Sequence, residues 1–331
     1  MTAPVTRVGA LEAATSVGRL PDGRWSALEI AFWVIPVACF FLLPNYRVLG
    51  SQVLITALFA VSLDLILGYA GIVSLGHAAY FGFGAYSAGL LSKHYFGEPL
   101  TGLVVGALAA GLLGYVTSHV IVRFRHLALI MLTLGFGLLL AEAANSASWL
   151  TGGADGLQGV KMTPLLGFKF DLYGRTAYAY SLAVLFLLFL LARRVIHSPF
   201  GLALRGIREN ATRMPAIGAP SLAHLRKVYT IAATLAGAAG ALLTQTTSTV
   251  SLEVLSFGRS ADVLVILILG GAGRLYGGIV GAVIYLVARD QFASMNPQYW
   301  YFWVGLLLVA VVLFLPNGVL GGLSALYKRP E

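Results

Sequence analysis

Ionisable side chains inside long apolar stretches are the residues of this chain that could do chemistry. Asp64, Glu142 and Asp262 lie in or beside hydrophobic runs. If those runs cross a bilayer, such acids are costly to bury and commonly contact a solute or an ion. Asp64 and Asp262 fall near the ends of their runs, where capping is an alternative role. A local hydrogen bond at a helix end is the alternative for Glu142. We take the three acids as candidate contacts of a translocated solute.

The segment 68–86 is rich in glycine, and its small residues recur every three or four positions. Close helix packing through these small residues is one interpretation. The other is a discontinuous helix whose backbone polar groups line a solute path. Ser74, His77 and Tyr80 are spaced by three residues, so we predict that they share one side of a helix and face that path.

Motifs for several other chemistries are missing. The sequence has no Gly-Lys dipeptide and therefore no phosphate-binding loop. Its six histidines are scattered and Cys39 is its one cysteine, so we expect no metal site and no disulfide. The chain has no recognisable means of hydrolysing ATP by itself.

The composition indicates what must position these residues. Of 331 residues, 58% are hydrophobic and 11% are charged, and the mean hydropathy is +0.84. Soluble domains average about 45–50% apolar and about 25% charged residues. These values exclude a soluble enzyme, a nucleic-acid binder and a disordered chain, and they predict an all-α integral membrane protein. The net charge of +9 then reflects cationic cytoplasmic loops.

About ten transmembrane helices are expected, because a span needs about 20 apolar residues. The predicted spans are 28–43, 48–67, 74–92, 101–120, 127–146, 178–195, 228–250, 261–272, 276–289 and 299–315. The region 261–289 is divided because its glycines interrupt it. The basic stretch 193–227 and the basic tail are both expected in the cytoplasm, so an even number of spans must separate them, and the division satisfies this. The two helices of 261–289 are then expected to be short or broken.

The positive-inside rule sets the expected orientation. With both termini in the cytoplasm, fifteen of the 22 lysines and arginines lie on the inside. We expect a cytoplasmic N-terminal segment (1–27), a transmembrane domain (28–322) and a cytoplasmic tail (323–331). Within the domain, 147–177 is a periplasmic loop and 196–226 a cytoplasmic loop.

The cytoplasmic loop contains a predicted short helix. Pro199 and Gly201 mark its start, and Leu204, Ile207 and Arg208 form one amphipathic turn. A second short element, closed by a glycine, follows. The loop could lie on anionic lipid headgroups, or it could dock a cytoplasmic partner in a protein groove.

Five motifs occur in succession along the chain: LGYAGIVSLGHAAY (67–80), LTGG (150–153), SPFG (198–201), LGGAGRLYG (269–277) and LFLPNG (313–318). Together they resemble the branched-chain amino-acid ABC transporter permease family, in particular its LivM-like inner-membrane subunit. The resemblance implies the ABC importer permease fold in the bacterial inner membrane.

The resemblance also implies a set of partners. Members of the family pair with a homologous second permease subunit and with two cytoplasmic ATPase subunits, which use ATP and Mg²⁺. A periplasmic solute-binding protein delivers branched-chain amino acids or a related small polar solute. The permease itself is then neither an enzyme nor a cofactor-binding protein, and its surroundings are the lipid bilayer rather than nucleic acid.

The cytoplasmic loop resembles the family's ATPase-coupling segment. The residues that the resemblance assigns to coupling are Arg205, Arg208, Glu209, Asn210, Ala216 and Gly218. The chain departs from the family pattern at Ala211 and Pro215, where acids are common. Because proline costs ~3 kcal/mol or more inside a helix, we expect the coupling helix to start or end at Pro215.

Two mechanisms are compatible with the sequence. In the first, nucleotide binding by the ATPases moves 205–218 and tilts the attached spans 178–195 and 228–250. In the alternative, the chain is a stand-alone secondary transporter or channel that couples through intramembrane acids such as Asp64 or Asp262.

Overall fold

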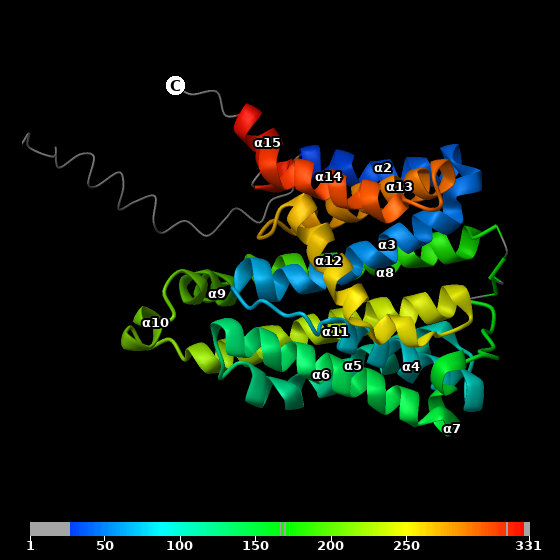
Figure 1. The fold of residues 1–331 in the computed structure, drawn as a ribbon, viewed down its shortest axis with the longest axis horizontal. Coiled ribbons are helices and arrows are strands. Elements are labelled where there is room, and N and C mark those ends of the chain that lie inside the picture. Colours follow the sequence, from blue (N-terminus) through cyan, green and yellow to red (C-terminus); the bar gives the residue numbers. More distant parts are fainter. Residues whose placement is uncertain (1–26, 166, 169, 172, 316, 328–331) are drawn as a thin grey trace, which may run out of the picture.

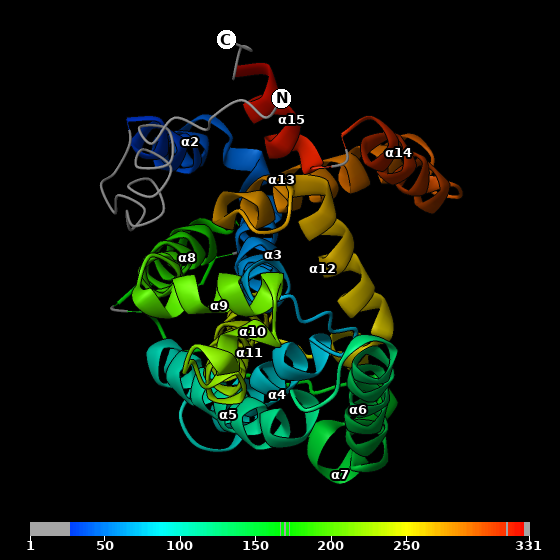
Figure 2. The ribbon, with the colours of Figure 1, turned by 90° about the vertical axis from the view of Figure 1, so that its left-hand side faces the viewer.

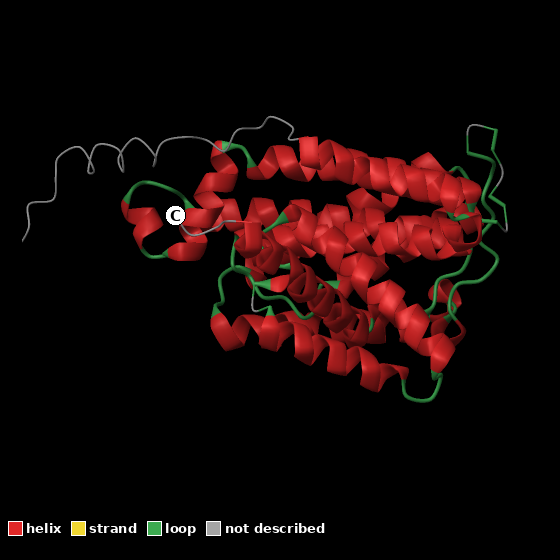
Figure 3. Ribbon diagram, turned by 90° about the horizontal axis from the view of Figure 1, so that it is seen from above, coloured by secondary structure: helices red, strands yellow, loops and turns green. Residues whose placement is uncertain are grey.

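The computed structural model describes residues 27–327 apart from 166, 169, 172 and 316. The predicted N-terminal segment, except Ala27, and the last four residues of the predicted tail lie outside this part of the chain. Every regular element within it is helical, and β-pairing there is confined to two isolated bridges. The helices lie side by side along the long axis, with most loops gathered at the two ends (Figures 1 and 3). The predicted all-α class is therefore confirmed.

The longer helices are α2 (Ala27–Leu42), α3 (Arg47–Asp64), α4 (Ala78–His94), α5 (Pro99–Ile121), α6 (His126–Ser146), α8 (Arg175–Ile196), α11 (Ser221–Thr247), α12 (Phe257–Gly270), α13 (Leu275–Met295), α14 (Trp300–Phe314) and α15 (Gly318–Tyr327). The short ones are α7 (Ser148–Thr151), α9 (Pro199–Glu209) and α10 (Arg213–Ala216). Six segments are long and apolar enough to span a bilayer, and the bent pair α12–α13 would be a seventh if it forms one span. Each predicted span overlaps a helix, although α2, α4, α12 and α14 are each shorter than a typical span of about 20 residues.

The chain is not helical throughout the predicted span 74–92. After α3 it forms a π-helical turn (Leu65–Tyr69), leaves the helix at Gly71 with a φ of +72°, and stays irregular until Ala78. Ser74 and His77 therefore precede α4, and the prediction that they share a helix face with Tyr80 is wrong. Backbone N–H groups of this segment are satisfied by side chains instead: Leu75 donates to Thr133 Oγ1 at 3.2 Å.

The predicted division of 261–289 is confirmed. Helices α12 and α13 meet at an angle of 111°, and the loop between them contains Gly271 with a φ of +110°. Glycine tolerates this backbone conformation because it has no Cβ. Only α12 is short, however; α13 has 21 residues and extends beyond the predicted end at 289.

Helices α3, α4 and α11 form the buried centre of the bundle. Most residues of α3 after Gln52 are buried, and α11 packs against α4 and α5 through alanines and glycines. Viewed from one end, α6 and α14 lie at opposite edges (Figure 2). Helix α6 exposes leucines and a methionine, and α14 exposes leucines, valines and aromatic side chains, as expected of surfaces that face lipid.

The two ends of the bundle differ. Helices α9 and α10 extend beyond the other helices at one end, while α7 and the loop 152–174 lie at the opposite end (Figure 1). The predicted cytoplasmic and periplasmic loops therefore lie at opposite ends of the bundle. This agrees with the single helix, α8, that separates them in the sequence.

Candidate functional site

A polar junction connects α9 to two irregular segments of the bundle. The guanidinium of Arg208 donates a hydrogen bond to the carbonyl of Gly68, in the π-helical turn. Asp64 is buried, and its Oδ1 accepts a hydrogen bond from the backbone N–H of Gly273 at 2.7 Å. Gly273 lies in the break between α12 and α13. We call Asp64, Gly68, Arg208 and Gly273 the coupling junction.

The junction depends on close backbone contact. A Cβ atom on Gly68 would lie 2.4 Å from the Gly273 nitrogen, so only glycine allows the two segments to approach this closely. Arg205, one turn earlier on α9, places its guanidinium 5.3 Å from the centre of the Tyr69 ring, within the range of a cation–π contact. Two of the predicted coupling arginines therefore contact the same turn.

The remaining predicted coupling residues belong to α10 and its flanks. Asn210 forms a turn just before α10, because its Oδ1 accepts hydrogen bonds from the backbone of Thr212 at 3.2 Å and of Arg213 at 3.0 Å. Glu209 and Ala216 are exposed, and Gly218 has a φ of +85°. The helix ends one residue after Pro215, in line with the expectation drawn from that proline.

A second cluster lies in the middle of the bundle. His77 Nε2 lies 2.8 Å from Ser62 Oγ, and the Ser62 hydroxyl donates to the Phe59 carbonyl at 2.6 Å. The Tyr80 hydroxyl lies 3.1 Å from that of Tyr229.

The structure separates the six predicted path residues into different places. Ser74, His77 and Tyr80 are all buried at the start of α4. Asp64 belongs to the coupling junction instead. Glu142 is exposed near the end of α6, where it accepts a hydrogen bond from Ser146 at 3.3 Å; this is the local bond considered as its alternative role.

Asp262 occupies a third place, in the first half of α12. Its Oδ1 accepts a hydrogen bond from the Tyr285 hydroxyl at 2.8 Å. It lines a small space together with Arg259, Tyr285 and Arg289, beside a polar cavity described below.

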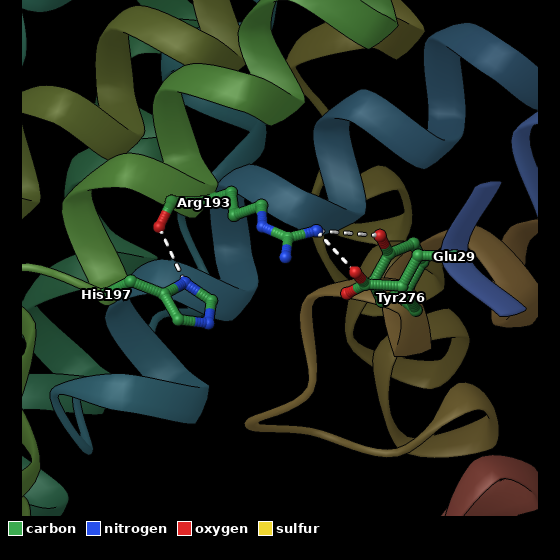
Figure 4. Close-up of polar contacts among 4 residues, drawn as sticks. All are labelled: Glu29, Arg193, His197 and Tyr276. Carbon is green, nitrogen blue, oxygen red and sulfur yellow. Dashed lines mark hydrogen bonds and ion pairs between the residues drawn. The ribbon is translucent and has the colours of Figure 1, made fainter. Parts of the chain in front are cut away.

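An ion pair next to the predicted cytoplasmic loop was not anticipated. Arg193 belongs to the basic stretch 193–227, but it lies within α8 and its side chain is only 9% exposed. It pairs with Glu29 of α2 at 2.9 Å and donates to the Tyr276 hydroxyl of α13 at 3.4 Å (Figure 4). Glu29 is the only acid in the first apolar run (28–43). An acid in such a run needs a partner, so its position could have predicted the ion pair.

Comparison with known proteins gives concordant matches. A model of the family described as branched-chain amino acid transport system / permease component matches residues 48–312. The high-affinity branched-chain amino acid transport system permease protein LivM of Salmonella typhimurium is 29% identical over 320 residues, covering 88% of this chain and 74% of its own length. The protein of the same name in Escherichia coli is 27% identical with the same coverage.

A more distant relative is archaeal. A probable branched-chain amino acid transport permease protein LivM of Methanocaldococcus jannaschii is 23% identical over 79% of this chain and 89% of its own length. No solved structure matches significantly.

Proposed function

The chain belongs to the branched-chain amino acid transport permease family and is a multi-pass membrane component of an ABC transport system, and from this premise we propose how it is driven. In this proposal α9 and α10 face the cytoplasm and receive an ATPase subunit. A homologous permease forms the other half of the path, and a periplasmic binding protein delivers the amino acid.

The coupling junction is the observation that carries the proposal. Buried Leu204 and Ile207 hold one face of α9 on the bundle, while α10 extends away from it. Arg208 links this pair of helices to the π-helical turn and to the α12–α13 break. Movement of α10 by a partner would therefore displace two segments in which the regular α-helical hydrogen bonding is interrupted.

The loop is also joined to long helices at both ends. Helix α8 leads into α9 through Ser198, and α11 begins at Ser221 soon after α10. The ion pair between Arg193 and Glu29 ties the end of α8 to α2. A displacement of the loop would thus be passed to α8 and α11, the helices named in the gating mechanism above.

The alternative of a stand-alone transporter driven through intramembrane acids is weaker. Asp64 accepts a backbone hydrogen bond and Asp262 accepts one from Tyr285. Both acids thus hold segments of the chain together, and they belong to separate clusters rather than to one proton or ion path.

The test is to replace residues 212–218 with a glycine–serine linker of equal length in the fully expressed transporter. We expect the chain to insert and to pair with its permease partner, but the ATPase should no longer co-purify and leucine uptake should be lost. The charge control is the Arg123→Ala/Arg125→Ala variant, which removes two exposed cations at the same end of the bundle. Uptake that survived the loop replacement would contradict the proposal.

A further inference from the structure

A polar cavity of about 210 Å³ lies at the end of the bundle opposite α9. It is formed between the start of α3, the end of α11, the start of α12 and the end of α13. Its polar lining includes Gln52, Ser251, Glu253, Arg259 and Arg289. The volume is below the 300–1,000 Å³ typical of sites for drug-sized ligands, and it suits a small solute.

The guanidinium group of each cavity arginine lies over an aromatic ring. The Arg259 guanidinium lies 5.4 Å from the centre of the Phe81 ring, and that of Arg289 lies 4.9 Å from the ring of Trp300. Neither forms an ion pair or a side-chain hydrogen bond with another described residue. A cation–π contact uses none of the N–H donors of a guanidinium, and paired N–H donors match a carboxylate.

Two acids lie near the two arginines of the cavity. Glu253 and Asp262 both interact electrostatically with Arg259. Asp262 and Tyr285 line an adjoining space of only about 10 Å³, which shares Arg259 and Arg289 with the cavity. Two cations and two anions leave the site with no net charge. A site with this balance and with separated charges favours a zwitterion over a simple anion.

The rest of the wall is apolar. Leu243, Val254 and Leu286 line the cavity beside the charged groups, and they can contact an aliphatic side chain. Phe59 borders the adjoining space of about 10 Å³, and its ring stacks on His77 at 5.4 Å. Packed side chains therefore separate the cavity from the buried cluster at the start of α4.

We propose that this cavity is an outward-facing recognition site for a zwitterionic aliphatic amino acid, with Arg259 and Arg289 binding its carboxylate and Glu253 and Asp262 attracting its ammonium group. The inference rests on the proposed function, because it takes this end of the bundle as periplasmic. The recognition site would select the amino acid a second time, within the membrane subunit, after the binding protein has released it.

The test measures binding of radiolabelled L-leucine to the assembled transporter in nanodiscs without the binding protein. Competitors are 4-methylpentanoate, which lacks the ammonium group, and leucinamide, which lacks the carboxylate. In Arg259→Gln or Arg289→Gln, leucine affinity should fall about ten- to a hundred-fold, the range for losing a charged hydrogen bond. Competition by leucinamide should stay unchanged, a selectivity that a merely structural defect would not produce.

Matched variants keep the result interpretable. Arg259→Lys retains the charge but not the fork of donors and should be intermediate. Arg175→Gln removes an exposed arginine at the same end but outside the cavity, and should match the wild type. Equal leucine affinity in Arg259→Gln, Arg289→Gln and Arg175→Gln, or no leucine binding by the wild type, would overturn the site. A failure of the proposed function would instead appear as absent leucine uptake by cells carrying the complete wild-type transporter.

Discussion

At the scale of single residues, the coupling junction depends on a few long-range polar contacts. Arg208 and Gly68 are 140 residues apart, and Asp64 and Gly273 are 209 apart, yet they bring α9, the π-helical turn and the α12–α13 break together. A hydrogen bond that involves a charged group contributes about 1.5–3 kcal/mol. The Arg208 contact therefore adds a directed link from α9 to the π-helical turn, beside the buried contacts of Leu204 and Ile207.

Replacing Arg208 with alanine should uncouple transport. We expect leucine uptake to fall about ten- to a hundred-fold, in proportion to the lost charged hydrogen bond, while the ATPase still co-purifies because α10 is intact. Uptake and ATPase rates in membrane vesicles measure this. Arg208→Lys should be partly active, and Arg194→Ala, an exposed arginine at the end of α8, should be normal. Equal uptake by Arg208→Ala and Arg194→Ala would show that the junction carries no coupling.

At the scale of elements, glycines set how closely α4 and α11 pack. A Cβ atom on Gly240 of α11 would lie 1.8 Å from the carbonyl oxygen of Phe81 on α4. The helix backbones are thus in direct contact, as small residues allow in membrane bundles. The glycine-rich segment 68–86 therefore serves packing, and it also contains the discontinuity before α4.

Gly240→Ala should destabilise the bundle by about 1–3 kcal/mol, the usual cost of overpacking. The melting temperature of the detergent-solubilised protein, followed by size-exclusion chromatography, should fall. Gly135→Ala on α6 is the matched control, because a Cβ atom there meets nothing within 4 Å. Alanine also favours helix over glycine by up to about 1 kcal/mol, so this variant should be neutral or slightly stabilised. Equal melting temperatures would mean that the two helices can separate without cost.

At the scale of the whole molecule, the direction of the bundle in the membrane links both proposals. Docking of an ATPase needs α9 and α10 in the cytoplasm, and amino-acid entry needs the cavity of Arg259 on the other side. The unequal distribution of lysines and arginines predicts this orientation, and the structure places the two features at opposite ends.

Labelling of introduced cysteines can test the orientation, because Cys39 is the only native cysteine. In a Cys39→Ala background, Gln158→Cys and Ala216→Cys each place a thiol at an exposed position at one end of the bundle. A membrane-impermeant maleimide should label the first in intact spheroplasts and the second only after permeabilisation. The reverse pattern would contradict both the coupling and the recognition proposals.

The sequence by itself determined the class of the protein and the approximate position of its helices. Apolar run length, the glycines near 271 and the basic loop are local signals, and each predicted span overlaps a helix because hydropathy and backbone flexibility act over a few residues. The five motifs were likewise sufficient for the family.

Only the tertiary structure decided where the functional side chains lie. Ser74 and His77 left the predicted helix because the chain breaks at Gly71 and its N–H groups find partners on α6 and α12. The Arg193 side chain is buried because it pairs with Glu29 on α2. Arg208 contacts Gly68, which is 140 residues away in the sequence. Such contacts join residues distant in sequence, so no local pattern encodes them, and they arise only when helices pack.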